Sequence, residues 1–194
     1  MRNTLSRRDV LKPALMLTLA PLLSGSQDAV AAPTSKVLVA YFTRTGNTRV
    51  IANQIRRARS ADFFEIEPAE AYPEDYEATV RQAERERDSG YEPPLKTRVP
   101  NVEGYEAVFL GFPIWGMTAP PVIRSFLAQH NLAGKTLVPF ITHGGYGRGQ
   151  SRNVLTRYAR RARILDGFLM QADQERQTLA QVSRWLGGVN AGGS

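Results

Sequence analysis

The sequence predicts a doubly wound α/β domain, a three-layer sandwich in which helices cover both faces of a five-stranded parallel sheet. Apolar runs alternate with helical patterns along the chain from residue 36 onward, as βαβ units do. Two of these runs, 36–42 after its first residue, Lys36, and 107–112, are continuously apolar, which is typical of strands buried on both faces. Right-handed crossovers are expected, and the strand order 2-1-3-4-5 is one common solution, with a ligand beyond the carboxyl ends of the first and third strands.

The first half of the domain contains two predicted strands and two predicted helices. After the strand at 36–42, a helix begins at Asn47, and its apolar face holds Ile51, Ile55 and Ala58. Residues 62–67 alternate between apolar and polar, which suits an edge strand. A charged helix over 74–88 has alternating charges, which predict a solvent-exposed face. Its thin apolar line is Tyr76, Val80 and Ala83.

The second half continues the alternation. The strand at 107–112 is followed by a helix that begins at the pair Pro120 and Pro121. The strand at 136–142 contains Pro139, which cannot donate to a ladder, so a bulge is expected there. A helix over 150–161 and a strand over 164–170 come next. The last helix ends near Leu186, with Leu179, Val182 and Leu186 facing inward.

Composition narrows the class of protein further. The chain has 194 residues, 42% of them hydrophobic, which suits a single domain with a sizeable core. It has no cysteine, which excludes disulfides, zinc–thiolate sites, iron–sulfur clusters and a cysteine nucleophile. The net charge of +7 is compatible with an acidic partner, an anionic membrane or nucleic acid. No nucleic-acid-binding motif accompanies the charge, so nucleic acid is not expected as a partner.

The first 32 residues have the pattern of an export signal. Arg7 and Arg8 precede an apolar run over 13–23, and small residues follow at 29–32. The apolar run is too short to span a bilayer, which needs about 20 residues. The stretch around the two arginines resembles a twin-arginine signal; a Sec signal or an uncleaved anchor is the alternative. We expect a signal over 1–32, a domain over 33–187 and a flexible tail over 188–194, in a periplasmic or otherwise exported protein.

Export would also change the charge of the protein. Residues 1–32 hold four basic and two acidic side chains, so the chain without them has a net charge of +5.

Three loops, each directly after a predicted strand, carry the candidate binding residues. The first consists of Thr43, Arg44, Thr45, Gly46, Asn47 and Thr48 and opens the first helix. Backbone N–H groups at a helix N-terminus, together with hydroxyl and amide groups, form a site for phosphate. The lysine-containing P-loop motif and the glycine-rich dinucleotide motif are both missing from this loop. A plain helix cap by Thr45 or Asn47 is the alternative interpretation.

The second loop follows the third strand and consists of Pro113, Ile114, Trp115, Gly116 and Met117. An indole in this position could lie flat on a planar ring. Gly116 can adopt backbone conformations closed to other residues, so a peptide here could approach a ligand nitrogen. A core tryptophan in a proline-rich turn is the alternative.

The third loop follows the fourth strand and consists of Thr142, His143, Gly144, Gly145, Tyr146 and Gly147. So many glycines indicate a binding surface made of backbone, or else a flexible linker. The two other loops at the same edge favour the binding surface. His143 has no second histidine or carboxylate patterned with it, so we expect it to orient the loop and predict no metal site.

Taken together, these loops resemble those of the flavodoxin superfamily, and of its short flavodoxin-like family in particular. The resemblance covers residues 36–186 and is carried by the runs VLVAYFTRTGNT, VFLGFPIWGMTAPPV and LVPFITHGGYGRG. It implies a flavodoxin-like fold that binds FMN. The first loop would hold the phosphate, the second would flank the isoalloxazine with Trp115 stacked on it, and the third would close the pocket.

Two features depart from the family pattern. The second loop reads Trp-Gly-Met-Thr, where relatives often carry a second aromatic residue. Electron-carrying flavodoxins are usually acidic, whereas this chain is basic, which argues against the usual basic reductase partner. The arginine-rich stretch over 148–163 is either a docking face for an acidic partner or a solvated helix face.

The resemblance implies an FMN-binding redox protein that transfers electrons in the periplasm. Its partner would be a redox protein or a small-molecule electron acceptor, without stable membrane insertion once the signal is cleaved. An FMN-dependent NAD(P)H:quinone or nitro-group reductase is one alternative. A flavodoxin-shaped binding protein without cofactor is another. No catalytic residue is predicted.

Overall fold

The computed structural model describes residues 35–171 and 175–189, so the predicted export signal lies outside the described residues. The strands form one parallel sheet in the order β2-β1-β3-β4-β5, and β6 also pairs with β4. The predicted strand order is therefore confirmed. The strands are β1 Val37–Tyr41, β2 Asp62–Glu65, β3 Ala107–Pro113, β4 Thr136–His143, β5 Arg163–Ile164 and β6 Phe168–Gln171.

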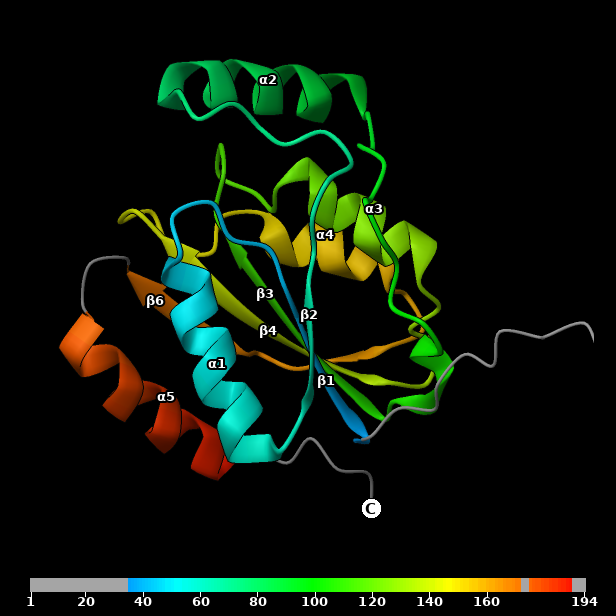
Figure 1. The fold of residues 1–194 in the computed structure, drawn as a ribbon, viewed down its shortest axis with the longest axis vertical. Coiled ribbons are helices and arrows are strands. Elements are labelled where there is room, and N and C mark those ends of the chain that lie inside the picture. Colours follow the sequence, from blue (N-terminus) through cyan, green and yellow to red (C-terminus); the bar gives the residue numbers. More distant parts are fainter. Residues whose placement is uncertain (1–34, 172–174, 190–194) are drawn as a thin grey trace, which may run out of the picture.

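Five α-helices and a short 3-10 helix accompany the sheet in the described residues. Figure 1 shows α1 and α5 together on one face of the sheet, with α3 and α4 on the other. The predicted three-layer arrangement is thus confirmed. The helices are α1 Asn47–Arg59, α2 Tyr76–Ser89, η1 Val102–Gly104, α3 Pro121–Gln129, α4 Ser151–Tyr158 and α5 Glu175–Gly188.

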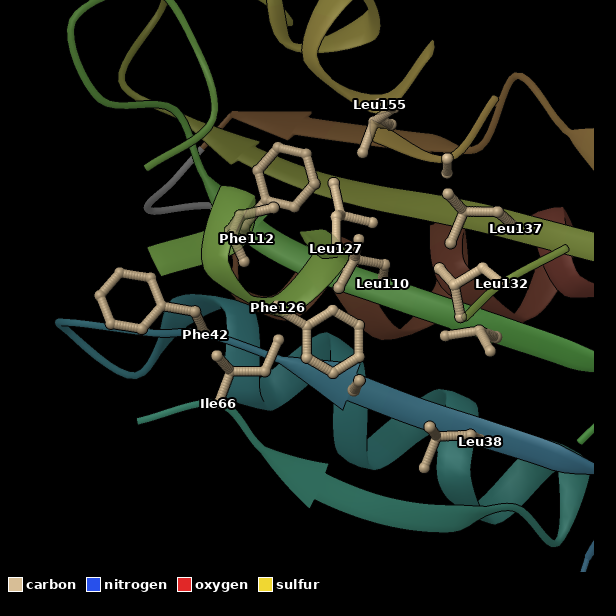
Figure 2. Packing of buried hydrophobic residues seen from close by; sticks show 14 of the residues in the cluster. Leu38, Phe42, Ile66, Leu110, Phe112, Phe126, Leu127, Leu132, Leu137 and Leu155 are labelled. Carbon is tan, nitrogen blue, oxygen red and sulfur yellow. The ribbon is translucent and has the colours of Figure 1, made fainter. Parts of the chain in front are cut away.

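Each face of the sheet buries its own apolar cluster. Val39 packs with Ile51 of α1 and Val182 of α5, and all three are fully buried. On the opposite face, Leu110 packs with Phe126 of α3 and other apolar side chains (Figure 2). Because both faces are covered, strands β1, β3 and β4 are almost continuously apolar, as the sequence indicated.

The proline in β4 perturbs the neighbouring strand rather than its own. Pro139 stays in register with Leu110 of β3. On its other side, the partner strand is interrupted between β5 and β6, where residues 165–167 lie opposite residues 138–139. Pro139 has no N–H to offer on that side. A side chain at Gly167, whose φ is +71°, would collide with the Pro139 carbonyl oxygen. The bulge that the sequence predicted in β4 is therefore found in the neighbouring strand, opposite Pro139.

Two helical faces differ from those that the sequence predicted. In α1, Ala58 is exposed and Ala52 is buried in its place beside Ile51 and Ile55. In α5, Leu179 is 43% exposed, whereas Val182 and Leu186 are buried. Both misplaced residues lie at the edge of an apolar stripe, where hydrophobic periodicity alone does not decide burial. α4 is also shorter than expected and ends at Tyr158.

The C-terminal helix continues through the predicted start of the tail. α5 runs to Gly188, and the Arg59 guanidinium donates hydrogen bonds to the carbonyls of Leu186 and Val189. The chain is thus held to the domain as far as Val189. The rest of the predicted tail, 190–194, lies outside the described residues.

Helix α2 has a different place from the other helices. Figure 1 shows it beyond the carboxyl ends of the strands instead of against a face of the sheet. Asp75 caps its N-terminus by accepting a hydrogen bond from Ala78 N at 2.7 Å. At the other end, Arg124 of α3 donates to the carbonyls of Glu86 and Tyr91 at 2.8 and 2.9 Å. The helix is therefore fixed above the edge of the sheet where the three candidate loops emerge.

Candidate functional site

The three candidate loops meet around one cleft at the carboxyl edge of the sheet. They follow β1, β3 and β4, which are adjacent in the sheet, so their carboxyl ends lie together. The cleft has a volume of about 620 Å³, within the range of small-molecule sites. It is lined by Thr43, Arg44, Thr45, Asn47, Thr48, Tyr76, Thr79, Val80, Ala83, Glu84, Arg87, Pro113, Ile114, Trp115, Gly116, Thr142 and Gly144.

Most of the predicted binding residues lie on this cleft. All of the first loop except Gly46, all of the second except Met117, and Thr142 with Gly144 of the third contribute to its lining. The predicted residues that do not line it are Gly46, Met117, His143, Gly145, Tyr146 and Gly147. The structure thus brings all three loops together, but only the start of the third reaches the cleft.

The first loop leaves the N-terminus of α1 available to a ligand. The N-cap residue is Gly46, whose φ of +92° suits glycine, and no side chain caps the helix. Thr43 Oγ1 accepts a hydrogen bond from Gly46 N at 3.1 Å. Val50 N makes the first helical bond, to Gly46 O, so the preceding N–H groups have no partner within the helix. Capping by Thr45 or Asn47, the alternative interpretation, is therefore wrong.

A buried hydroxyl pair joins the first loop to the end of β4. Thr48 Oγ1 and Thr142 Oγ1 are 2.9 Å apart, and both residues are buried. Each hydroxyl satisfies the other away from water. This pair fixes the first turn of α1 against the start of the third loop.

The second loop is a tight turn with an unusual backbone. Trp115 and Thr118 exchange two backbone hydrogen bonds of 2.9 and 3.1 Å, which leaves Gly116 and Met117 as the two central residues. Both have positive φ, +52° and +66°, the pattern of a type I′ turn. Such a φ is strained for methionine. Gln150 N donates to the Met117 carbonyl at 2.7 Å, which helps to hold the turn.

Trp115 is oriented by two other aromatic rings. Its indole meets Phe42 at a centroid distance of 5.2 Å and Tyr72 at 4.9 Å, at angles of 82° and 85°. Edge-to-face pairs of this kind stabilise one ring orientation. Trp115 is half-buried and belongs to both the cleft lining and the periphery of the core. Trp115 therefore packs against the core, as one interpretation predicted, and also lines the cleft, as the other predicted.

His143 orients the third loop. Its Nδ1 accepts hydrogen bonds from Gly145 N at 3.0 Å and from Gly147 N at 3.2 Å. Burial lowers the pKa of the imidazole, which favours the neutral form that can accept them. No cluster of His, Asp or Glu in the described residues could hold a metal ion.

Helix α2 supplies the part of the site that the sequence analysis missed. Its residues on the cleft are Tyr76, Thr79, Val80, Ala83, Glu84 and Arg87, which share one helical face. The thin apolar line of this helix is the available signal, but the alternating charges around it favour a solvent-exposed helix instead. Arg44 links the first loop to the segment directly before this helix, because its Nη2 donates to Glu74 O at 2.6 Å.

Comparison with known proteins decides the family. The family model described as Flavodoxin matches residues 36–188, nearly the whole of the described chain. This chain belongs to the flavodoxin family. No curated protein matches the chain.

Solved structures agree with the flavodoxin assignment. A candidate flavoprotein from Bacteroides eggerthii is 33% identical over 80% of this chain and 99% of its own, with a TM-score of 0.69. A second, from Bacteroides uniformis, is 28% identical over 77% and 98%, with a TM-score of 0.67. A Lactobacillus acidophilus flavoprotein in complex with FMN is 18% identical over 75% and 99%; its TM-score of 0.61 shows a shared fold.

The residues on the cleft of this flavodoxin suit FMN. The uncapped N-terminus of α1 offers N–H groups and a positive helix dipole, which favour a phosphate. Thr43 and Thr45, which carry hydroxyl groups, line the cleft beside it. At the other end, Ile114 and Trp115 provide apolar surface for a planar ring. Both the family and this chemistry therefore support the predicted cofactor, FMN.

Proposed function

We propose that this protein binds FMN in the three-loop cleft and transfers electrons in the periplasm. The observation that carries the proposal is the meeting of the uncapped α1 N-terminus and the two other loops around one cleft of ligand size. Residues 43–48 would bind the phosphate, residues 113–117 would flank the isoalloxazine, and residues 142–147 would close the pocket. FMN itself supplies the redox chemistry, while the protein positions it and sets its electrostatic surroundings.

The predicted export signal supports a periplasmic location. A twin-arginine route carries folded proteins, so the chain would acquire FMN in the cytoplasm before crossing the membrane. The absence of cysteine is also compatible with an oxidising compartment. Nicotinamide coenzymes are mainly cytoplasmic, so an electron carrier fits this location better than an NAD(P)H-dependent reductase.

The electron partner would be a redox protein or a small molecule. The net charge of +5 after residue 32 favours a partner with an acidic face. None of the helices in the described parts of the chain is long and apolar enough to cross a membrane.

The first experiment tests FMN binding and location together. The full chain is expressed in a bacterium with twin-arginine export, and the periplasmic fraction is examined for the protein. We expect a yellow protein with a flavin absorbance spectrum. The variant with Arg7→Lys and Arg8→Lys is the control and should stay yellow but remain in the cytoplasm. A colourless protein without affinity for added FMN would contradict the proposal. It would favour the alternative function, a flavodoxin-shaped binding protein without cofactor.

Stopped-flow reduction separates the carrier from the enzyme. The purified yellow protein is mixed with NADH or NADPH, and with dithionite as a control for a reducible flavin. A carrier should be bleached rapidly by dithionite and only slowly by the nicotinamides. Rapid bleaching by either nicotinamide would assign the protein to the FMN-dependent reductases instead.

A further inference from the structure

Helix α2 places a guanidinium group against the second loop of the cleft. Arg87 lies on the cleft lining, and its Nη1 is so close to Gly116 that a Cβ there would collide with it. In flavodoxins this loop is the one expected to flank the isoalloxazine. Among the described residues, the other charged side chains on the cleft are those of Arg44, at the phosphate loop, and Glu84, one helical turn before Arg87. The second loop thus faces a positive charge that α2 supplies.

One side-chain hydrogen bond and a fixed backbone turn hold Arg87 in this position. Its Nε donates to Asp88 Oδ1 at 2.9 Å, and no other side-chain hydrogen bond of Arg87 occurs in the described residues. The Asp88 side chain is 70% exposed, so water screens its charge, whereas the Arg87 side chain is only 34% exposed. Arg124 anchors the backbone of this turn through the carbonyls of Glu86 and Tyr91. The guanidinium is therefore presented to Gly116 by a turn that is itself fixed.

We propose that Arg87 raises the reduction potential of the bound FMN by stabilising the charge that it gains on reduction. This inference rests on the proposed function. When a reductant such as dithionite transfers two electrons and one proton is taken up, the bound group gains one negative charge. A nearby cation favours that state over the oxidised one. The basic cleft of this chain would therefore poise FMN at a higher potential than an acidic cleft would.

Neutral replacement of Arg87 tests the charge directly. The midpoint potential of the FMN-loaded protein is measured with reference dyes and dithionite for wild type, Arg87→Gln, Arg87→Lys and Arg85→Gln. We expect Arg87→Gln to weaken binding of reduced FMN about tenfold relative to oxidised FMN, which equals a fall of about 30 mV for a two-electron couple. Arg87→Lys keeps the positive charge, so its midpoint potential should fall much less than that of Arg87→Gln. Arg85 is exposed on the same helix and does not line the cleft, so its variant should match wild type.

The outcomes distinguish this inference from the proposed function. A wild-type protein that binds no FMN would contradict the proposed function. An Arg87→Gln protein that binds FMN with unchanged potential would overturn the role of Arg87 alone, as would an equal fall for Arg85→Gln. If the Arg87 variants do not fold, as judged by circular dichroism, Glu84→Gln decides. Removing that exposed carboxylate from the same cleft should raise the potential, and an unchanged potential would contradict the inference.

Discussion

At the scale of single residues, the cleft depends on a few side chains and glycines that join elements distant in the sequence. Thr48 and Thr142 lie 94 positions apart, yet their buried hydroxyls form one hydrogen bond. Gly116 has a positive φ and lies against Arg87 from another element. Neither contact adds much apolar burial. Each fixes the position of one loop relative to the rest of the site.

Replacing Thr48 with Val should destabilise the FMN-free protein by about 1–2 kcal/mol. Valine preserves the shape of threonine but leaves the buried Thr142 hydroxyl without its partner. Urea denaturation measures the change in free energy of unfolding. Thr45→Val is the matched control, because Thr45 is exposed in the same loop and its replacement should change stability by less than about 0.5 kcal/mol. Equal losses for the two variants would contradict the structural role of the hydroxyl pair.

Replacing Gly116 with Ala should weaken FMN binding as well as stability. The φ of +52° costs an alanine about 1–2 kcal/mol, and the added methyl group must also displace Arg87. Gly134→Ala provides a comparison, because Gly134 has a φ of +75° and nothing within 4 Å of the new methyl group. Gly116→Ala should lose at least as much stability in urea as Gly134→Ala. Only Gly116→Ala should raise the FMN dissociation constant; an equal affinity for both would exclude a close approach at Gly116.

At the scale of elements, α2 lies away from the faces of the sheet, and one of its own faces lines the cleft. It lies beyond the strand ends (Figure 1), and its inner face lines a hollow instead of packing into the core. Its stability therefore depends on its ends. Asp75 caps the first turn and Arg124 binds the last carbonyls. Tyr72 adds a hydrogen bond to Glu86 at 2.8 Å.

Replacing Arg124 with Met should loosen α2 without unfolding the domain. Met keeps the apolar part of the side chain but loses the hydrogen bonds to the carbonyls of Glu86 and Arg87 in the last turn of α2 and of Tyr91 just after it. Loss of about 1.5 kcal/mol corresponds to roughly tenfold faster amide exchange. Hydrogen exchange read by mass spectrometry should show this effect in α2 and not in α1 or α5. Arg152→Met, which removes an exposed ion pair with Asp166, should leave α2 unchanged. Uniformly faster exchange would instead indicate global destabilisation.

At the scale of the whole molecule, one buried histidine ties the long connection between β2 and β3 to the core. His130 is 6% exposed, and its Nε2 accepts a hydrogen bond from Val99 N at 3.0 Å. Its Nδ1 lies 2.7 Å from the Phe126 carbonyl oxygen, so this nitrogen carries the proton. Burial lowers the pKa of His130, and nearby Arg98 lowers it further, although Phe126 and Glu103 oppose this. The folded protein therefore requires the neutral imidazole.

Stability should accordingly fall as the pH drops below about 6.5. Below that pH the unfolded chain binds a proton at His130 that the folded chain does not, which costs up to about 1.4 kcal/mol per pH unit. The free energy of unfolding is compared at pH 7.5 and pH 5.5 by urea denaturation. His130→Gln should flatten this dependence. His143→Gln should remove less of it, because His143 is more exposed. An identical dependence in wild type and His130→Gln would contradict the assignment.

Much of the fold could be predicted because its signals are local. Continuous apolar runs at β1, β3 and β4 indicate burial on both faces, and helical periodicity separates them. The position of each binding loop follows from the strand before it. Ala58 and Leu179 were misplaced because they lie at the edge of their stripes, where packing against neighbouring elements decides burial. The effect of Pro139 was assigned to the wrong strand, since its missing N–H concerns a partner distant in sequence.

The sequence by itself therefore determined the parallel sheet and the three loops that each follow a strand, whereas the structure decided among the strand orders that such a sheet can adopt. The sequence did so because alternation, periodicity and loop position are properties of neighbouring residues. Only the tertiary structure decided that α2 leaves the face of the sheet and brings Arg87 to Gly116. A thin apolar stripe on a charged helix is compatible with either solvent or a cleft. The choice depends on contacts with α3 and the first loop, which no local pattern encodes.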